Sequence, residues 1–513
     1  MNLSFVSLCR SAGICLAVLL FLVCTTRAQR GTSGSIEGTI TDVQGGAISG
    51  AKLRAVNSDT GLKLESVSDE NGLFHFPVVP PGTYVLTAEN AGFSNYAVRV
   101  SVAVGATVDL PIQLKVGTQV SSVTVTSETP ILEVTRTSVE SSVNERAVSD
   151  LPTLGRNFIN FTLLTPGVTT DVRGGDISFA GQRGTLNSLI VDGSDNNNTF
   201  FGQTLGRTGS GRAPYQFSQD AVQEFQVNSN AYSAEYGSAG GAVINVVTKS
   251  GTNQFHGTGF EFFRDRSLNA TDPIAKAQGK AKQPYHFNQF GGNLGGPVLK
   301  DRLFFFFDYD GQRNITQNLV LPVSGCATPS TDANVTAACT YLLARSASWT
   351  SGFNQDVYLG KADWHINSNE LLTVRINSQR FTGANLENGG SSNSLEHTGA
   401  AIVISDTLSG QLTSTLSPRF VNEFRAAYVR DNEPGQANST NPEASVFNGP
   451  QLQLTVGRNF FSPRFTNIKR GQFADVLTWV KGRHTVKFGG DVLTDAIANF
   501  FPGNFPALTP LIV

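Results

Sequence analysis

The side chains best suited to chemistry follow no familiar catalytic or metal-binding pattern. Asp192, Asp195 and the run 196–198 (three asparagines) supply the oxygen ligands that Ca²⁺ prefers. Their spacing differs from that of an EF-hand loop, so a polar loop is the alternative interpretation. The six histidines are scattered, and none stands at metal-ligand spacing from another. We therefore predict no metal site and no cofactor.

Sequence signatures of common enzymes are also missing. The chain contains no HExxH zinc helix, no GxSxG nucleophile elbow and no complete phosphate-binding loop. The stretch 308–311 (Asp-Tyr-Asp-Gly) is explained by a strand end followed by a turn. The formal net charge of −2 provides no general attraction for nucleic acid. An enzyme or a nucleic-acid-binding protein is therefore not expected.

Two cysteines remain as candidates for a covalent cross-link. Three of the five cysteines lie close to the N-terminus, which leaves Cys326 and Cys339 in a polar segment. In an oxidising compartment these two could pair. A disulfide closing so short a loop contributes ~3 kcal/mol in the chain-entropy model. Two free thiols are the alternative.

The N-terminus predicts export. Arg10 precedes the apolar run 14–23, and 26–28 (Thr-Arg-Ala) resembles a cleavage site for signal peptidase. The run is shorter than the ~20 apolar residues of a membrane-spanning helix. We expect residues 1–28 to be a cleaved signal peptide, with a retained anchor as the alternative.

The second half of the chain alternates apolar and polar residues with the period of a β-strand. One example is the apolar set Leu372, Val374, Ile376 against the polar set Thr373, Arg375, Asn377. Repeated strands with one apolar and one polar face suit a barrel with lipid outside and a polar lumen. We expect roughly nine antiparallel strands over 253–513, with extracellular loops at 314–353 and 431–469.

Residues 31–116 alternate in the same way over shorter strands separated by turns, which predicts a β-sandwich. The segment 70–72 (Glu-Asn-Gly) is a strong hairpin signal. The blocks 36–56, 68–93 and 100–114 resemble the carboxypeptidase regulatory-like domain, a transthyretin-like fold grouped with carbohydrate-binding-like folds. The resemblance implies no peptidase activity. Five aromatic residues could stack on sugars or pack in the core: Phe74, Phe76, Tyr84, Phe93 and Tyr96.

Residues 117–250 mix short strands, short helices and many glycines, which predicts a compact α+β unit. The blocks 151–168, 180–198 and 222–257 resemble the plug of a TonB-dependent outer-membrane receptor of the Oar-like type. The block 288–313 resembles the early barrel strands of the same group. The expected fold is mainly β: a sandwich at 31–116, a small plug at 117–250, and the first strands of a transmembrane β-barrel at 253–513.

The expected barrel is incomplete. Barrels that hold a plug have ~22 strands, and an open edge in hydrocarbon leaves costly unpaired backbone groups. We therefore expect the chain to be a C-terminally truncated receptor or a fragment of one.

The resemblance implies energised uptake of an unknown extracellular ligand across the outer membrane, with carbohydrate as one candidate class. Its partners would be outer-membrane lipid and the TonB protein, which pairs with a short strand by β-augmentation. The candidate TonB box is Ser122, Val123, Thr124, Val125 and Thr126. The alternative is that this segment is the last strand or the linker of the sandwich.

Arg156, Arg183 and Asp192 lie within the plug-like blocks and are candidates for gating or for contact with the barrel. For the arginines, the alternative is a structural role opposite a barrel carboxylate. An outer-membrane adhesin, or a secretion-associated interaction protein without import activity, is the alternative function.

Overall fold

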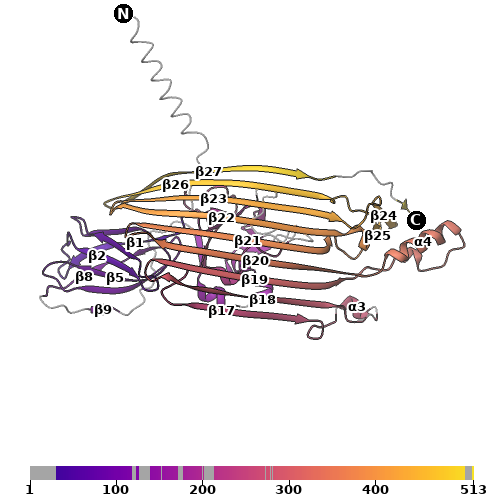
Figure 1. Cartoon of the computed structure of the whole chain (residues 1–513), viewed down its shortest axis with the longest axis horizontal. Helices are drawn as coiled ribbons and strands as arrows, with labels where there is room; N and C mark the ends of the chain where they lie inside the picture. Colours follow the sequence, from indigo (N-terminus) through magenta and orange to yellow (C-terminus); the bar gives the residue numbers. More distant parts are fainter. Residues whose placement is uncertain are drawn as a thin grey trace, which may run out of the picture.

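The computed structural model describes residues 31–502 and 511–512, apart from 118–122, 126–138, 152, 171–176, 199, 201–212, 272, 278 and 280. The expected signal peptide and two residues of the candidate TonB box, Ser122 and Thr126, lie outside the described residues. Figure 1 shows three units: an N-terminal unit at one end, a large curved sheet, and an inner unit against that sheet. Among the described residues, no helix has the length and apolarity needed to cross a membrane.

The N-terminal unit is a sandwich of two sheets. Its strands are β1 (Gly34–Asp42), β2 (Lys52–Asn57), β3 (Lys63–Val67), β4 (Leu73–Val79), β5 (Gly82–Glu89), β6 (Tyr96–Val102), β7 (Thr107–Asp109), β8 (Ile112–Leu114) and β9 (Val123–Val125). One sheet has the order β4-β1-β7, with β8 also on β1, and the other has the order β3-β2-β5-β6-β9. Alternate residues of strands such as β1 and β5 face the shared core, as their period-two pattern predicts.

The turn at 70–72 and the five aromatic residues of this unit can be compared with the sequence predictions. The turn at 70–72 forms, with Gly72 at positive φ, but it joins β3 to β4. Those strands belong to different sheets, so the hairpin prediction was wrong. Phe74, Phe76 and Tyr84 are buried in the core, with Phe93 and Tyr96 packed against it. Core packing is therefore the role that the structure gives these five aromatic side chains.

The inner unit, residues 139–248, contains a five-stranded mixed sheet and several short helices. The strands are β10 (Val139–Val143), β11 (Val168–Thr170), β12 (Ile177–Phe179), β13 (Ser188–Val191), β14 (Ser194–Asp195), β15 (Val222–Asn230) and β16 (Val243–Thr248), and the helices are α2 (Glu145–Asp150), η1 (Leu154–Arg156), η2 (Phe158–Leu164), η3 (Gly184–Leu186) and η4 (Gln219–Ala221). The main sheet has the order β10-β15-β16-β13-β14. Its core includes Phe306 and Leu359 from the curved sheet, so the two units share one apolar cluster.

The curved sheet, called here the barrel sheet, contains nine strands in the described part of the chain. They are β17 (His256–Asp265), β18 (Tyr285–Leu299), β19 (Leu303–Asn318), β20 (Trp349–His365), β21 (Glu370–Glu387), β22 (Gly399–Ser417), β23 (Phe420–Ala437), β26 (Arg464–Lys481) and β27 (His484–Phe500). Each strand pairs antiparallel with the next in this order. The predicted strand number and direction are confirmed.

The two faces of the barrel sheet differ as the alternation predicts. On β21, Arg375 is 1% exposed and Asn377 2%, whereas Ile376 between them is 57% exposed. On β27, Asp491 is 2% exposed and its neighbour Val492 is 57% exposed. The polar side chains face the inner unit, and the apolar ones form an outer surface suited to lipid.

Connections between strands are short at one end and long at the other. β20 joins β21, and β26 joins β27, through tight turns near the N-terminal unit, whereas the long connections gather at the opposite end (Figure 1). Transmembrane barrels have short periplasmic turns and longer extracellular loops. The N-terminal unit therefore lies at the periplasmic end.

The long connections are shorter and more ordered than expected from the sequence. β19 continues to Asn318, so the first predicted loop narrows to 319–348 and contains α4 (Ala333–Arg345) with η5 (Ser324–Cys326). The second narrows to 438–463 and contains the hairpin β24 (Ala444–Asn448) and β25 (Gln451–Val456). Shorter elements at this end are α3 (Pro273–Ala277), η6 (Leu395–His397) and β28 (Leu511–Ile512), which pairs with β24.

Candidate functional site

The turn between β13 and β14 brings a carboxylate of the inner unit to the barrel sheet. Asp192 has φ 46° and Gly193 has φ 75°, which makes a tight turn. The Asp192 carboxylate accepts hydrogen bonds from the Thr248 backbone N–H (2.9 Å) and hydroxyl (2.7 Å). These bonds fix the carboxylate from within the inner unit.

Two cations of the barrel sheet meet this carboxylate. Lys361 Nζ lies 3.8 Å from Asp192 Oδ1, and Arg375 Nε lies 3.4 Å from Oδ2. Burial opposes ionisation of Asp192, but the two cations and the Thr248 bonds outweigh burial and hold the pKa of this carboxyl below its ordinary value. The predicted contact residue Asp192 therefore lies in a buried ion-pair cluster between two units.

The same turn makes a second ionic contact with the barrel sheet. Asp195 Oδ1 lies 2.6 Å from Arg470 Nη1, and the Arg470 Nε donates to Asp495 at 2.9 Å. The Asp195 backbone N–H donates to Gln472. Asp192 and Asp195 thus face basic side chains. Among the described residues, no group of three or more His, Cys, Asp or Glu side chains is placed to hold a metal ion.

A further contact between the inner unit and the barrel sheet centres on Tyr215. The Tyr215 hydroxyl accepts from Gln289 Nε2 (2.7 Å) and Gln312 Nε2 (2.6 Å). The Tyr215 carbonyl accepts from the side chains of Gln355 and Gln379. Four glutamines from β18 to β21 therefore hold one buried tyrosine of the inner unit. Sequence reasoning missed Tyr215, although the glutamines occupy the polar positions of their strands.

Arg156 contacts both the inner unit and the barrel sheet. Its guanidinium forms an ion pair with Asp220 of the inner unit. The same group lies over the rings of Phe260 and Phe262 on β17, 4.7 and 4.5 Å from their centroids. The carboxylate partner thus belongs to the inner unit rather than to the barrel, and the barrel contact is a cation–π interaction. Arg183 is exposed at the start of η3.

Part of the candidate TonB box is a strand. β9 pairs in parallel with β6, with Ala97 opposite Thr124. β9 stands at the end of its sheet. The structure therefore gives Val123–Val125 the position of a last sandwich strand, with one side of the strand paired.

The N-terminal unit is hydrogen-bonded to the inner unit. Glu224 on β15 is 8% exposed, and its carboxylate accepts from the Val104 backbone N–H at 2.5 Å. Burial raises the pKa of Glu224 to about 7, with the Val104 bond lowering it and the charge of Glu145 raising it further. The Asn245 side chain also donates to the Gly31 carbonyl. Sequence reasoning missed Glu224, whose burial depends on two units meeting.

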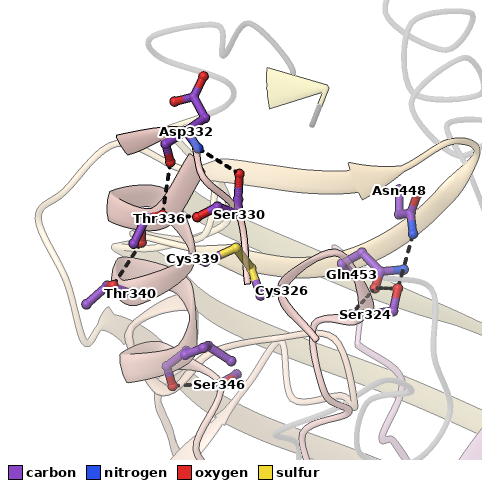
Figure 2. The surroundings of a disulfide bond; sticks show 11 residues. Ser324, Cys326, Ser330, Asp332, Thr336, Cys339, Thr340, Ser346, Asn448 and Gln453 are labelled. Atoms are coloured by element: carbon purple, nitrogen blue, oxygen red, sulfur yellow. Dashed lines mark hydrogen bonds between the residues drawn. A yellow bond between two sulfur atoms is a disulfide. The ribbon is translucent and has the colours of Figure 1, made fainter. Parts of the chain in front are cut away.

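A disulfide joins Cys326 to Cys339 at the long-loop end, with a Cα–Cα distance of 5.4 Å. Figure 2 shows this bond between η5 and α4, whose N-terminus is capped by Asp332. Ser324 donates to Gln453 of the β24–β25 hairpin. An apolar cluster joins these elements and includes Val320, Trp349, Val446 and Leu454. We call η5, α4, the β24–β25 hairpin and this apolar cluster the loop cap.

Comparisons with known proteins agree with this architecture. The model of the outer membrane beta barrel domain family matches residues 247–337 and 326–507, and that of the carboxypeptidase regulatory-like domain matches residues 35–115. The chain is 28% identical over 312 residues to the TonB-dependent transporter Oar of Myxococcus xanthus, covering 58% of this chain and 28% of that protein. It is 28% identical over 143 residues to the probable TonB-dependent siderophore receptor PirA of Acinetobacter baumannii, covering 25% of this chain and 17% of that protein.

Solved structures include similar proteins. The outer membrane transporter YddB from Escherichia coli has a TM-score of 0.49 at 14% identity, covering 70% of this chain and 48% of its own. The siderophore receptor PirA from Acinetobacter baumannii has a TM-score of 0.48 at 16% identity, with the same coverage. This chain thus spans less than half of the length of these relatives, with 28% of Oar and 48% of YddB covered. On its family match, the chain belongs to the outer membrane β-barrel domain family, a family of the outer membrane, and it is similar to the TonB-dependent transporter Oar.

Proposed function

We propose that the chain acts in TonB-dependent, energised uptake of an extracellular ligand, with the inner unit as the plug. The observation that carries this proposal is the buried contact between the inner unit and the polar face of the barrel sheet. Asp192 and Asp195 meet basic side chains there, and the four-glutamine contact with Tyr215 lies beside them. A unit held by polar contacts can be displaced more readily than one sealed by an apolar core alone, since water can replace hydrogen-bond partners.

The proposed domain boundaries are a sandwich at 31–116, a plug at 117–250 and barrel strands from 253. The periplasmic placement of the N-terminal unit supports this order, because β9 then lies where TonB can reach it. We propose Ser122 to Thr126 as the TonB box and Asp192 and Arg156 as residues that retain the plug. Arg183, which is exposed, is proposed as a contact made only when the plug moves.

The box assignment is tested by replacing Val123 and Val125 with proline in the full chain and measuring binding of its cognate TonB. Proline removes backbone donors that β-augmentation needs, so binding should fall. Val116→Pro, in the exposed sequence before the box, is the matched control and should bind normally. Unchanged binding of the double variant would reject the assignment.

A second candidate function is supported by the loop cap. A disulfide-linked, folded module at the extracellular end suits an adhesin or a secretion-associated interaction protein that works without import. The ligand of either function is proposed to be an extracellular molecule, with carbohydrate as one class. Uptake requires TonB and accumulates ligand inside the cell, whereas adhesion persists when TonB is deleted.

A further inference from the structure

Two positive charges lie directly opposite each other on the lumen face of the barrel sheet. Lys361 on β20 and Arg375 on β21 are Cα partners in the ladder. Both are buried, with Lys361 8% and Arg375 1% exposed. Like charges directly opposite across a strand pair are destabilising, and burial adds a desolvation cost. An arrangement of this kind is stable only with an anion between the two side chains.

The anion is supplied by a different unit. Asp192 reaches the pair from the β13–β14 turn, but its carboxylate is bonded to Thr248 and lies 3.4 to 3.8 Å from the two cations. The barrel sheet therefore presents a pair of basic groups, and the inner unit fills the space between them with a carboxylate of its own.

The pair also has binding capacity that Asp192 leaves unused. Arg375 Nη1 is buried and has no hydrogen-bond partner among the described residues. Arg375 Nε and Nη2 donate to Ser409 Oγ and the Val191 carbonyl, each at 3.3 Å. A guanidinium can donate five hydrogen bonds in a fixed fork that matches carboxylate and phosphate. One arm of this fork is free to bind an anion.

A cavity of about 120 Å³ adjoins the pair at the periplasmic end, lined in part by Asp192, Lys361, Arg375 and Gln411. Asp363 also lines it, as a second carboxylate bonded to the Thr373 hydroxyl at 2.7 Å. This cavity has room for several water molecules, since a single water needs ~10–15 Å³ of cavity volume. A carboxylate or phosphate group therefore fits beside the pair once the turn moves.

We propose that Lys361 and Arg375 form an anion-binding site on the barrel wall, occupied at rest by Asp192 and otherwise by a carboxylate or phosphate group. This inference rests on the proposed function, and it names the substrate class as solutes that carry an anionic group. A solute on the path to the periplasm exchanges with Asp192, so the wall cations are never left without a negative partner.

The test is chemical rescue of Asp192→Ala in the purified full chain in detergent. Acetate and phosphate are the probes, and chloride at equal ionic strength is the reference. We expect the variant to melt at a lower temperature than the parent chain and to gain about 2–4 °C or more with either probe. The parent chain, Glu65→Ala at an exposed ion pair, and the double variant Asp192→Ala with Arg375→Met should show no gain.

A folded Asp192→Ala chain that gains nothing, or an equal gain in the double variant, would overturn the anion site. If Asp192→Ala does not fold, Thr248→Val decides, since it removes only one of the bonds that hold the Asp192 carboxylate. Its melting temperature should rise with phosphate, and a flat response would also overturn the site. These measurements need no TonB. Rescue without uptake would count against the proposed function alone, and uptake without rescue against the anion site alone.

Discussion

Glu224→Gln is expected to strengthen the contact between the N-terminal unit and the inner unit above neutral pH. Burial raises the pKa of Glu224 from its ordinary value of 4.5 to about 7. Each pKa unit corresponds to ~1.4 kcal/mol, so the buried charge costs the docked state about 3 kcal/mol at high pH. Because the pKa of Glu224 is raised in the docked state, its contribution to the stability of the contact is fully present below pH 4.5. This contribution is lost as the pH rises through about 7.

Glutamine keeps the shape of Glu224, and its Oε1 can still accept from the Val104 N–H, but it never carries the buried charge. The parent and the variant should therefore be alike at pH 4.5. At pH 8, the Val104 amide in the variant should be protected from hydrogen exchange up to about two orders of magnitude more strongly than in the parent. Glu65→Gln, at an exposed carboxylate of the N-terminal unit, is the control and should leave this protection unchanged.

Hydrogen exchange is measured by mass spectrometry on peptides that contain Val104 and is corrected for intrinsic exchange. It gives the protection of the variant relative to the parent at each pH. Equal protection of the parent and Glu224→Gln at both pH values would refute a cost of the buried charge. Weaker protection of the variant at pH 8 would refute it too, because the carboxylate would then stabilise the contact in its charged form.

Three further predictions concern other contacts. Tyr215→Phe should destabilise the contact between the inner unit and the barrel sheet by about 1–3 kcal/mol, because Gln312 loses its buried acceptor whereas Gln289 keeps Asp310. An unchanged melting temperature would contradict this. Replacing Cys326 and Cys339 together by serine should destabilise the loop cap by ~3 kcal/mol. Proteolysis within 319–348 should then be faster, while the melting temperature of the barrel sheet is preserved. Ser330→Ala is the control. A disulfide should form between cysteines introduced by Ala97→Cys and Thr124→Cys, because these positions are Cα partners. TonB binding should stay within about two-fold of that of the parent chain, because the outer edge of β9 stays open. Loss of binding on oxidation, reversed by reductant, would show that β9 must leave the sandwich.

The period-two pattern predicted the barrel strands well near the periplasmic end and less well towards the loops. Around Leu372 and Ile376 the apolar residues mark the outer face, because they meet lipid there. β21 continues to Glu387, where polar residues occupy both faces, so the pattern fades before the strand ends. β18 was recognised only by resemblance, because its glycines carry no side chain that could show a face.

Site residues were predictable only as far as one strand or turn defines them. Asp192 was a candidate because it lies in a plug-like block and in an oxygen-rich run, and the lumen direction of Arg375 followed from the alternation on its strand. Their meeting depends on how the plug sits against the barrel sheet, which no local pattern encodes. The alternative interpretation of Arg156 placed a carboxylate partner on the barrel, but its partner Asp220 belongs to the inner unit, because η4 places Asp220 beside Arg156.

The length of the barrel strands determines how far the protein projects from the cell. β21 has 18 residues, whereas ~9–11 tilted residues cross the hydrocarbon. The surplus of about eight residues, at ~3.3 Å each and tilted by ~45°, raises the strand tops by about 20 Å. The disulfide and α4 thus stand clear of the headgroup layer, where a bulky soluble molecule can dock without first approaching lipid.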